Sequence, residues 1–254
     1  MKKNLVNGMI ETAHKSGEIL LKYFGKSFKV REKRGAGLVS EADIASEESA
    51  IRMLKKLQPD FGVLAEESGA QEKEAGRWII DPLDGTTNFV RGFPVFCVSI
   101  AAEWDGEVIA GVIYHPIMNE TYVAIKNQGA FLNRKPIRVS SVKKLKDSLL
   151  STGFSYRKGE LNLEIDAFAR LSKAAGAVRR PGSAALDLAF TARGIFDGFW
   201  ERKLSPWDVA AGTLLVEEAG GKVTDFKGNR FKITHPEILA SNSGIHNNLL
   251  KTIS

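Results

Sequence analysis

Two aspartates three positions apart, Asp81 and Asp84, flank a proline and precede a run of small polar residues over 85–88. The apolar residues 78–80 lead directly into Asp81, so the segment is typical of a buried strand, an acidic corner and the start of a helix. Backbone N–H groups at a helix start can bind an anion, and hard cations such as Mg2+ bind carboxylate oxygens together with substrate phosphates. The segment therefore predicts a metal-dependent phosphate site.

Three further acids lie where a fold can direct side chains into a cleft. Glu66 follows a short apolar segment that predicts a strand, while Asp43 and Asp208 each lie in the first turn of a predicted helix. Asp is also favoured in helix caps and turns, so Asp208 alone is more typical of a helix N-terminal acid than of a metal ligand. At this level a purely structural turn at residues 81–84 stays open as the alternative.

The elements that must position these acids follow from periodicity and capping signals. Helices are predicted at residues 5–24, 41–57, 161–175, about 185–191, 206–219 and from 245 onward. Strands are predicted at residues 28–31, 38–39, 61–65, 77–80, 95–104, 107–114, 121–125, 129–139, 148–152, 178–180 and 195–201, with a strand-rich stretch over 222–241. The order indicates a mixed α/β (α+β) fold with a largely antiparallel centre and layers of helices around it.

The chain reads as one domain. It has 254 residues and no linker, so we expect a single domain over 1–254 with subdomains of about 1–145 and 146–254. Hydrophobic content of 43% and charged content of 26% are ordinary for a soluble globular protein. No apolar run approaches the roughly 18 residues of a membrane span, so we expect a cytoplasmic protein that does not enter membranes.

Charge and cysteine content bear on other classes of function. The net charge of +6 invites nucleic-acid binding, but the basic clusters at 31–34, 143–146 and 179–180 are short and lack interleaved aromatics, so we do not expect it. A mild positive field would instead draw small phosphorylated metabolites toward a site. The single cysteine, Cys97, excludes an intramolecular disulfide, and its apolar neighbours indicate a buried core thiol.

Histidines do not fit the predicted chemistry. A metal-activated water can attack a phosphate ester without a histidine nucleophile. The four histidines lie in a helix, a turn and loops without a partner motif, and we expect surface or capping roles for His14, His115, His235 and His246.

Two segments together resemble a known family. Residues 81–89, which read DPLDGTTNF, are similar to the first signature of the inositol monophosphatases. Residues 207–212, WDVAAG, followed by EEAGG at 217–221, resemble the second signature. The segments 39–43 and 66–68 lie at the spacing that the family shows before the first signature, and no part of the chain falls outside the match.

The resemblance implies a layered αβαβα sandwich, with a largely antiparallel first sheet and a smaller mixed second sheet. It implies a homodimer that hydrolyses phosphate monoesters with two or three Mg2+ ions, held by Glu66, Asp81, the Leu83 carbonyl, Asp84 and Asp208. Thr86 and Asp43 would orient and deprotonate the attacking water close to Glu66. The Gly85 and Thr86 amides would bind phosphate oxygens.

The resemblance also implies how the alcohol part of the substrate is bound. Gly182, Ala184 and Glu201 match family positions around the inositol hydroxyls, and Asp84 and Asp208 would lie against the substrate as well. Two departures stand out. Arg202 and Lys203 replace an uncharged residue and glycine of several relatives, and two added cations could favour a second phosphate or a bulkier phosphorylated ligand. The catalytic lysine of the family's flexible lip falls on Lys33 or Arg34.

Several functions share this predicted metal core. The first hypothesis is a lithium-sensitive inositol-1-monophosphatase. Relatives acting on fructose 1,6-bisphosphate, histidinol phosphate or a 3′-phosphonucleotide are the alternative within the enzyme class. A regulatory dimer associated with RNA or the transcription machinery is the alternative outside it, but the complete set of ligands argues against a protein without catalysis.

Overall fold

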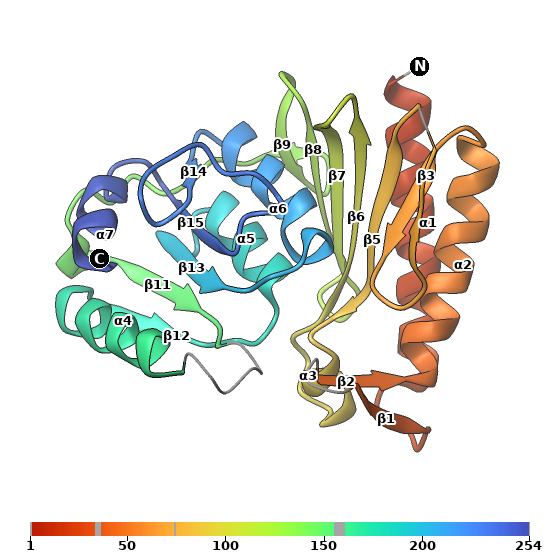
Figure 1. Ribbon diagram of the computed structural model, residues 1–254, viewed down its shortest axis with the longest axis horizontal. Coiled ribbons are helices and arrows are strands. Elements are labelled where there is room, and N and C mark those ends of the chain that lie inside the picture. The colour runs from red at the N-terminus through yellow and green to blue at the C-terminus, as the bar shows by residue number, and fades with distance from the viewer. Residues whose placement is uncertain (1, 34–36, 74, 155–160, 254) are drawn as a thin grey trace.

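The computed structural model describes residues 2–33, 37–73, 75–154 and 161–253 of the chain, and it has five layers (Figure 1). One outer layer holds α1 (Lys2–Tyr23) and α2 (Glu41–Leu57), and it covers an eight-stranded sheet. The central helices α5 (Ala184–Ala192) and α6 (Pro206–Glu218) separate this sheet from a five-stranded one. The other outer layer holds α4 (Leu161–Ala174) and α7 (His246–Ile253). This arrangement confirms the predicted αβαβα fold.

The larger sheet has the order β10-β9-β8-β7-β6-β5-β3-β4, and the only parallel pair that the described residues form in it is β3 with β5. Its strands are β3 (Gly62–Ala65), β4 (Gly69–Gln71), β5 (Arg77–Asp84), β6 (Cys97–Trp104), β7 (Glu107–His115), β8 (Glu120–Ile125), β9 (Gly129–Leu132) and β10 (Lys135–Pro136). The antiparallel meander over β6 to β9 is the one that the alternating sequence predicts.

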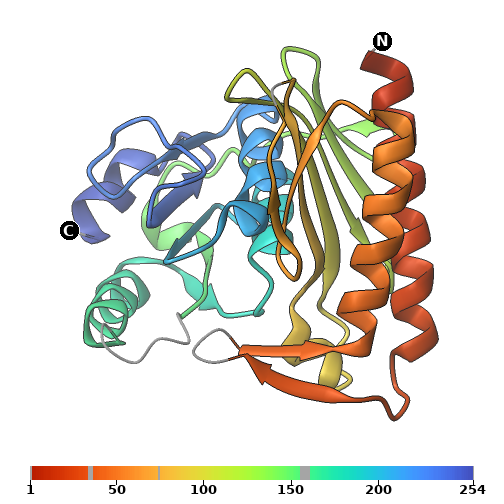
Figure 2. The ribbon, with the colours of Figure 1, turned by 45° about the vertical axis from the view of Figure 1, so that its right-hand side comes forward.

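The smaller sheet is mixed. Its order is β12-β11-β13-β15-β14, with parallel pairs on both sides of β11 and antiparallel pairs on both sides of β15. The strands are β11 (Leu149–Thr152), β12 (Ala177–Arg179), β13 (Gly198–Arg202), β14 (Lys222–Thr224) and β15 (Glu237–Ser241). The short pair β1 (Val30–Lys33) and β2 (Gly37–Ser40), the helix α3 (Thr86–Val90) and the 3-10 turn η1 (Leu145–Asp147) lie outside both sheets. Figure 2 shows β1 and β2 below the large sheet, next to α3.

Three hydrophobic clusters bind the layers together. One lies between the large sheet and α1 with α2, one surrounds α5 and α6, and one lies between the small sheet and α4 with α7. Side chains on β5 alternate between the first two clusters, since Trp78 and Ile80 face α2 while Ile79 faces α6. The strand is therefore buried on both faces where it approaches Asp81.

The predicted strand at 77–80 is longer than expected. Asp81 still pairs with Ser99 and Asp84 with Cys97, while the register shifts between the two aspartates. Pro82 falls in that irregular stretch, where its missing N–H costs no ladder hydrogen bond. The acidic corner is thus a bulge inside β5 rather than a turn after it. The stretch over 222–241 is also less regular than predicted, since only β14 and β15 form strands there.

Two histidines contradict the predicted surface role. His115 is 3% exposed and His246 is 1% exposed. The ring of His246 contacts Thr224 Oγ1 at 3.0 Å and Ser241 Oγ at 2.7 Å, so hydroxyl partners make its burial tolerable. Cys97 is buried, as predicted. Among the described residues no helix has the length and apolar character needed to cross a membrane.

Candidate active site

The start of α2 holds the predicted water-activating carboxylate in a fixed position. Ser40 caps the helix, and its N–H and Oγ donate to Asp43 Oδ2 at 2.7 and 2.5 Å. The other oxygen, Asp43 Oδ1, lies 3.1 Å from the Thr86 hydroxyl. Burial raises the pKa of Asp43, and the hydrogen bonds from Ser40 oppose that shift. The structure thus brings the predicted pair together across 43 residues of sequence.

Thr86 begins α3, and its hydroxyl has two acceptors within reach. Leu83 O lies 3.0 Å from Thr86 Oγ1, a little closer than Asp43 Oδ1. The hydroxyl has a single hydrogen, so a cation on the Leu83 carbonyl would leave that hydrogen to Asp43. Gly85 precedes it with a φ of 93°, and a Cβ there would lie 2.8 Å from Val95 O. Only glycine therefore fits the turn that presents Thr86.

Four carboxyl groups, of which Asp81 is buried and the others are half-buried, act on one another electrostatically. The pKa of Asp81 lies well above its usual range because of burial, and then because of Glu66, Asp84 and Asp208. Burial raises the pKa of Asp84 to about 6, while donors on Ser183 and Ala185 lower it. The pKa of Asp208 is also raised well above its usual range, first by burial and then by the charge of Asp84. Acids that raise one another's pKa in this way lie close together and favour the binding of protons or cations.

The donor atoms fit hard divalent cations. In the part of the chain that the structure describes, no three His, Cys, Asp or Glu side chains already form a cage. One oxygen of each aspartate is held by protein donors: Asp81 Oδ1 by Leu83 N at 3.0 Å, Asp84 Oδ2 by Ser183 Oγ at 2.7 Å, and Asp208 Oδ2 by Ser205 N at 2.6 Å. The Leu83 carbonyl oxygen, which accepts from Thr86 Oγ1, adds a backbone oxygen to these side chains. Oxygen donors around buried negative charge suit Mg2+.

Glu66 is positioned by a residue that the sequence did not single out. Glu47 on α2 is 3% exposed, and its carboxylate accepts from Glu67 N and Ser68 N, both at 2.8 Å. Ser46, its neighbour, donates to Pro82 O at 2.9 Å. One turn of α2 therefore fixes both the turn after Glu66 and the bulge in β5. Helical spacing from Asp43 was the only sequence signal for these two residues.

Asn88 links the two halves of the site. Its Nδ2 lies 2.8 Å from Val95 O and 2.8 Å from Pro181 O, with Gly182 O at 3.3 Å. Gly182 has a φ of 88°, and a Cβ there would come within 3.2 Å of the Asn88 amide. The loop that precedes Ala184, the first residue of α5, is thereby held against α3.

Glu201 lies in the same region on β13. A Cβ at position 153 would lie 2.2 Å from Glu201 Oε2, so Gly153 leaves room for this carboxylate. Burial raises the pKa of Glu201 well above its usual range, and Asp208 and Asp84 add to the shift. Asp187 on α5, which sequence reasoning missed, is 1% exposed and has its pKa raised by burial and then by Glu201. The only indication of Asp187 in the sequence was that it is the single acid in a helix of apolar and small residues.

Arg202 does not face this region, so the prediction that it adds a cation beside the substrate pocket is wrong. Neighbouring strand residues point to opposite sides of a sheet, and Arg202 points away from the side of Glu201. Its Nη1 lies 2.5 Å from Glu237 Oε2, and its guanidinium lies 4.5 Å from the centre of the Phe226 ring. Lys203 follows with a φ of 60°. Of the two candidate lip residues, Arg34 and the side chain of Lys33 lie outside the described residues.

Comparisons with known proteins agree with this geometry. A family model described as the inositol monophosphatase family matches residues 1–254. The inositol-1-monophosphatase of Mesorhizobium japonicum is 43% identical over 98% of this chain and 96% of its own length. The Nus factor SuhB of Xylella fastidiosa is 43% identical over 90% of this chain and 84% of its own.

Solved structures show the same relationship. The crystal structure of the extragenic suppressor protein suhB from Bartonella henselae has a TM-score of 0.94 and 40% identity, covering 98% of this chain and 97% of that one. The chain is a phosphatase and belongs to the inositol monophosphatase family.

Proposed function

We propose that the chain hydrolyses inositol 1-phosphate to myo-inositol and phosphate in a Mg2+-dependent reaction. The observation that carries this proposal is the contact of Thr86 Oγ1 with Asp43 Oδ1, 3.1 Å long, together with the mutual influence of the Asp81, Asp84 and Asp208 carboxyl groups. A hydroxyl fixed by a carboxylate is the part that activates a water, and grouped carboxylates are the part that holds cations.

The residues divide the work of the reaction. When Thr86 donates its hydrogen to Asp43, the Thr86 oxygen can accept a hydrogen bond from the attacking water and orient it. The proton that the water loses passes through Thr86 to Asp43. Glu66, Asp81, the Leu83 carbonyl, Asp84 and Asp208 would hold two or three Mg2+ ions, which would lower the pKa of bound water and neutralise charge on the phosphate and the leaving oxygen. Such help is needed because phosphate monoesters hydrolyse extremely slowly unaided.

The remaining predicted residues bind the two ends of the substrate. The N–H groups of Gly85 and Thr86 lie at the start of α3, before the N–H groups that form hydrogen bonds within the helix. They would bind phosphate oxygens. Glu201 and the backbone at Gly182 and Ala184 would bind ring hydroxyls. A buried carboxylate that accepts from a hydroxyl discriminates strongly against alcohols that lack it.

A second candidate comes from the relatives. Some are named Nus factor SuhB, so a regulatory role of a dimer beside the transcription machinery is the alternative.

A homodimer is supported here by three exposed apolar residues at the start of α4, namely Leu161 (39%), Leu163 (53%) and Ile165 (45%). We expect sedimentation to show a dimer, and Leu163→Glu to shift it toward monomer; an unchanged sedimentation coefficient would place the interface elsewhere.

The decisive experiment is a panel of phosphorylated substrates with Mg2+. We expect inositol 1-phosphate to exceed fructose 1,6-bisphosphate, histidinol phosphate and a 3′-phosphonucleotide in kcat/KM. Asp84→Asn and Asp208→Asn should each lower kcat/KM by more than about 100-fold, since changes to mere supporting residues of metal sites already cost about 10–100-fold. The matched control is Asp60→Asn, an exposed aspartate outside the site. Wild-type rates in both site variants would refute the metal assignment, and another preferred substrate would refute the inositol assignment alone.

A further inference from the structure

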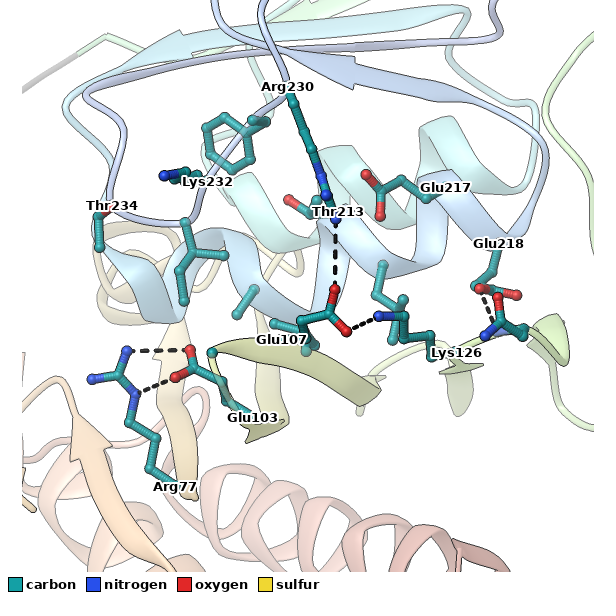
Figure 3. Close-up of a pocket in the computed structure, with 17 residues that line it drawn as sticks. Arg77, Glu103, Glu107, Lys126, Thr213, Glu217, Glu218, Arg230, Lys232 and Thr234 are labelled. Atoms are coloured by element: carbon teal, nitrogen blue, oxygen red, sulfur yellow. Dashed lines mark hydrogen bonds and ion pairs between the residues drawn. The ribbon is translucent and has the colours of Figure 1, made fainter. Parts of the chain in front are cut away.

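A cavity separate from the candidate active site lies along the C-terminal half of α6 (Figure 3). Its volume is about 580 Å3, within the range of small-molecule sites. The β6–β7 hairpin forms one wall, the loop at 230–234 forms the opposite wall, and α6 forms the floor. Glu217, on this floor, follows Asp208 by nine residues, which is roughly 13 Å along a helix axis. An occupant would therefore not touch the groups around Thr86.

Thr213 on the cavity floor has an unused hydroxyl. The residue is 9% exposed, and Oγ1 has no hydrogen-bond partner among the described residues. On other helices, Thr12, Thr191 and Thr252 each donate to the carbonyl four residues earlier, at 2.8 Å. A buried hydroxyl without a partner costs free energy, so a ligand group at this point would be favourable.

Glu217 offers a free carboxylate one turn further along α6. Its neighbour Glu218 accepts from Asn127 N at 2.7 Å and Gly129 N at 2.8 Å, whereas Glu217 accepts no hydrogen bond from any described residue. An acid at a helix C-terminus is disfavoured by the helix dipole unless a cation neutralises it. Glu217 is an exposed residue, and partial burial of its carboxylate raises its pKa, an effect that Arg230 opposes.

Two basic residues of the opposite wall line the cavity. Figure 3 shows Arg230 reaching across the cavity toward Glu107, while Lys232 lies on the side of Arg230 that is away from Glu217. The Arg230–Glu107 pair is loose, since the atoms are 3.8 Å apart and the Arg230 side chain is 85% exposed. Lys126 is held more closely by Glu107. Arg230 and Lys232 are therefore the groups available to an anion.

An apolar surface completes the cavity. Leu214 is 5% exposed, Ala210 is fully buried, and Val108 and Ile233 lie beside them in the lining. The cavity thus offers one carboxylate with a hydroxyl, two available cations and an apolar floor. A ligand with only one charge would give an oppositely charged partner either to Glu217 or to the cations, but not to both. An uncharged ligand would give such a partner to neither.

We propose that this cavity binds a zwitterionic α-amino acid with an apolar side chain. Its ammonium group would bind Glu217 and Thr213, its carboxylate would bind Arg230 and Lys232, and its side chain would lie on Leu214. Charge-assisted hydrogen bonds at both ends would orient it, and burial of the side chain would select for apolar residues. This site does not depend on the phosphatase substrate.

The test is calorimetric titration of the full chain with three probes of similar shape. L-leucine carries both charges, 3-methylbutylamine lacks the carboxylate, and 4-methylpentanoate lacks the ammonium group. We expect leucine to bind and each analogue to bind at least about tenfold more weakly, because each leaves a charged group of the protein without its partner. Absence of leucine binding up to about 10 mM, or equal binding of either analogue, would overturn the proposal.

Variants locate the site. Glu217→Gln and Arg230→Gln should each weaken leucine binding by about tenfold or more, while Glu48→Gln, an exposed glutamate on α2, should leave it unchanged. Arg230 is on the surface, so its variant folds even if Glu217→Gln does not. Leucine binding that survives both cavity variants would refute this assignment, whatever the outcome of the substrate panel.

Discussion

At the scale of single residues, the site depends on which hydrogen bond each small polar group makes. Asn88 is an example. In the sequence it belongs to a run of small polar residues that predicts an anion site, but its amide instead donates to Val95 O and Pro181 O at 2.8 Å. The residue therefore couples the loop that would bind the phosphate to the loop before Ala184.

We predict that Asn88→Ala raises KM for inositol 1-phosphate by about tenfold, because the amide contacts that hold the loop at residues 181–182 are lost. KM for 4-nitrophenyl phosphate, which has no ring hydroxyls, should change by less than about threefold. Steady-state kinetics on both substrates measures this. Asn7→Ala, at an exposed position of α1, is the control. Equal losses on both substrates would show that Asn88 does not act through the second loop.

At the scale of elements, α2 supports more of the site than any motif indicates. Asp43, Ser46 and Glu47 are three and four residues apart and lie on one face of this helix. They contact Thr86, Pro82 O and the turn after Glu66, respectively. Because a helix moves as a unit, these three contacts keep the predicted base, the bulge and the first carboxylate in register.

His246 joins three elements of the smaller half. It begins α7 and contacts Thr224 on β14 and Ser241 on β15. Burial lowers its pKa to about 4, and Lys222 adds to the shift. The unfolded state, with an ordinary pKa near 6.5, takes up the proton first as the pH falls. The stability contributed by the neutral ring is therefore complete above about pH 6.5 and is lost progressively toward pH 4, by up to about 3 kcal/mol.

We predict that the Tm of His246→Gln falls less than that of the wild type when the pH is lowered from 7.5 to 4.5. Glutamine keeps a hydrogen-bonding side chain at this position but cannot titrate. The difference should be about 5 °C or more for a chain of this size, measured by thermal unfolding with Mg2+ absent. Asn247→Gln, at an exposed position of α7 that does not titrate, serves as the control and should follow the wild type. Identical pH dependence of wild type and His246→Gln would contradict a neutral buried ring.

At the scale of the whole molecule, the site lies where the two halves of the chain meet. Asp43, Asp81 and Asp84 come from the first half, while Glu201 and Asp208 come from the second. The start of α5 connects them, since Ser183 Oγ and Ala185 N both donate to Asp84 Oδ2 at 2.7 Å. Repulsion among these acids opposes their assembly unless protons or cations are bound.

We predict that the metal-free protein becomes less stable between pH 5.0 and 7.5. Burial raises the pKa of Asp84 in the folded state to about 6, above the ordinary value of 3.8 that holds in the unfolded chain. The stability that protonated Asp84 contributes is therefore fully present below pH 3.8 and is lost as the pH rises through about 6. Mg2+ should therefore raise Tm by several degrees more at pH 7.5 than at pH 5.0, where protons compete for the same oxygens. Thermal unfolding after EDTA treatment, with NaCl of equal ionic strength as control, measures this. An equal rise at both pH values would argue against carboxylate ligands.

The sequence by itself predicted a mixed α/β fold with layers of helices and the bounds of α2 at 41–57, and its resemblance to a family added the αβαβα order and the grouping of the acids with Asp81. It could do so because periodicity, capping and the order of residues in a signature are local properties of the chain. It also placed Thr86 with Asp43, although only through the family resemblance, since no spacing rule joins residues 43 positions apart.

Only the tertiary structure decided which side chains meet and which face away. Glu47, Asp187 and Asn88 acquire their roles from partners on other elements, and Arg202 loses its predicted role because the register of β13 directs it to Phe226. The burial of His246 likewise depends on hydroxyls 5 and 22 residues away. Such contacts follow from how layers pack, which is a property of the assembled chain rather than of any segment.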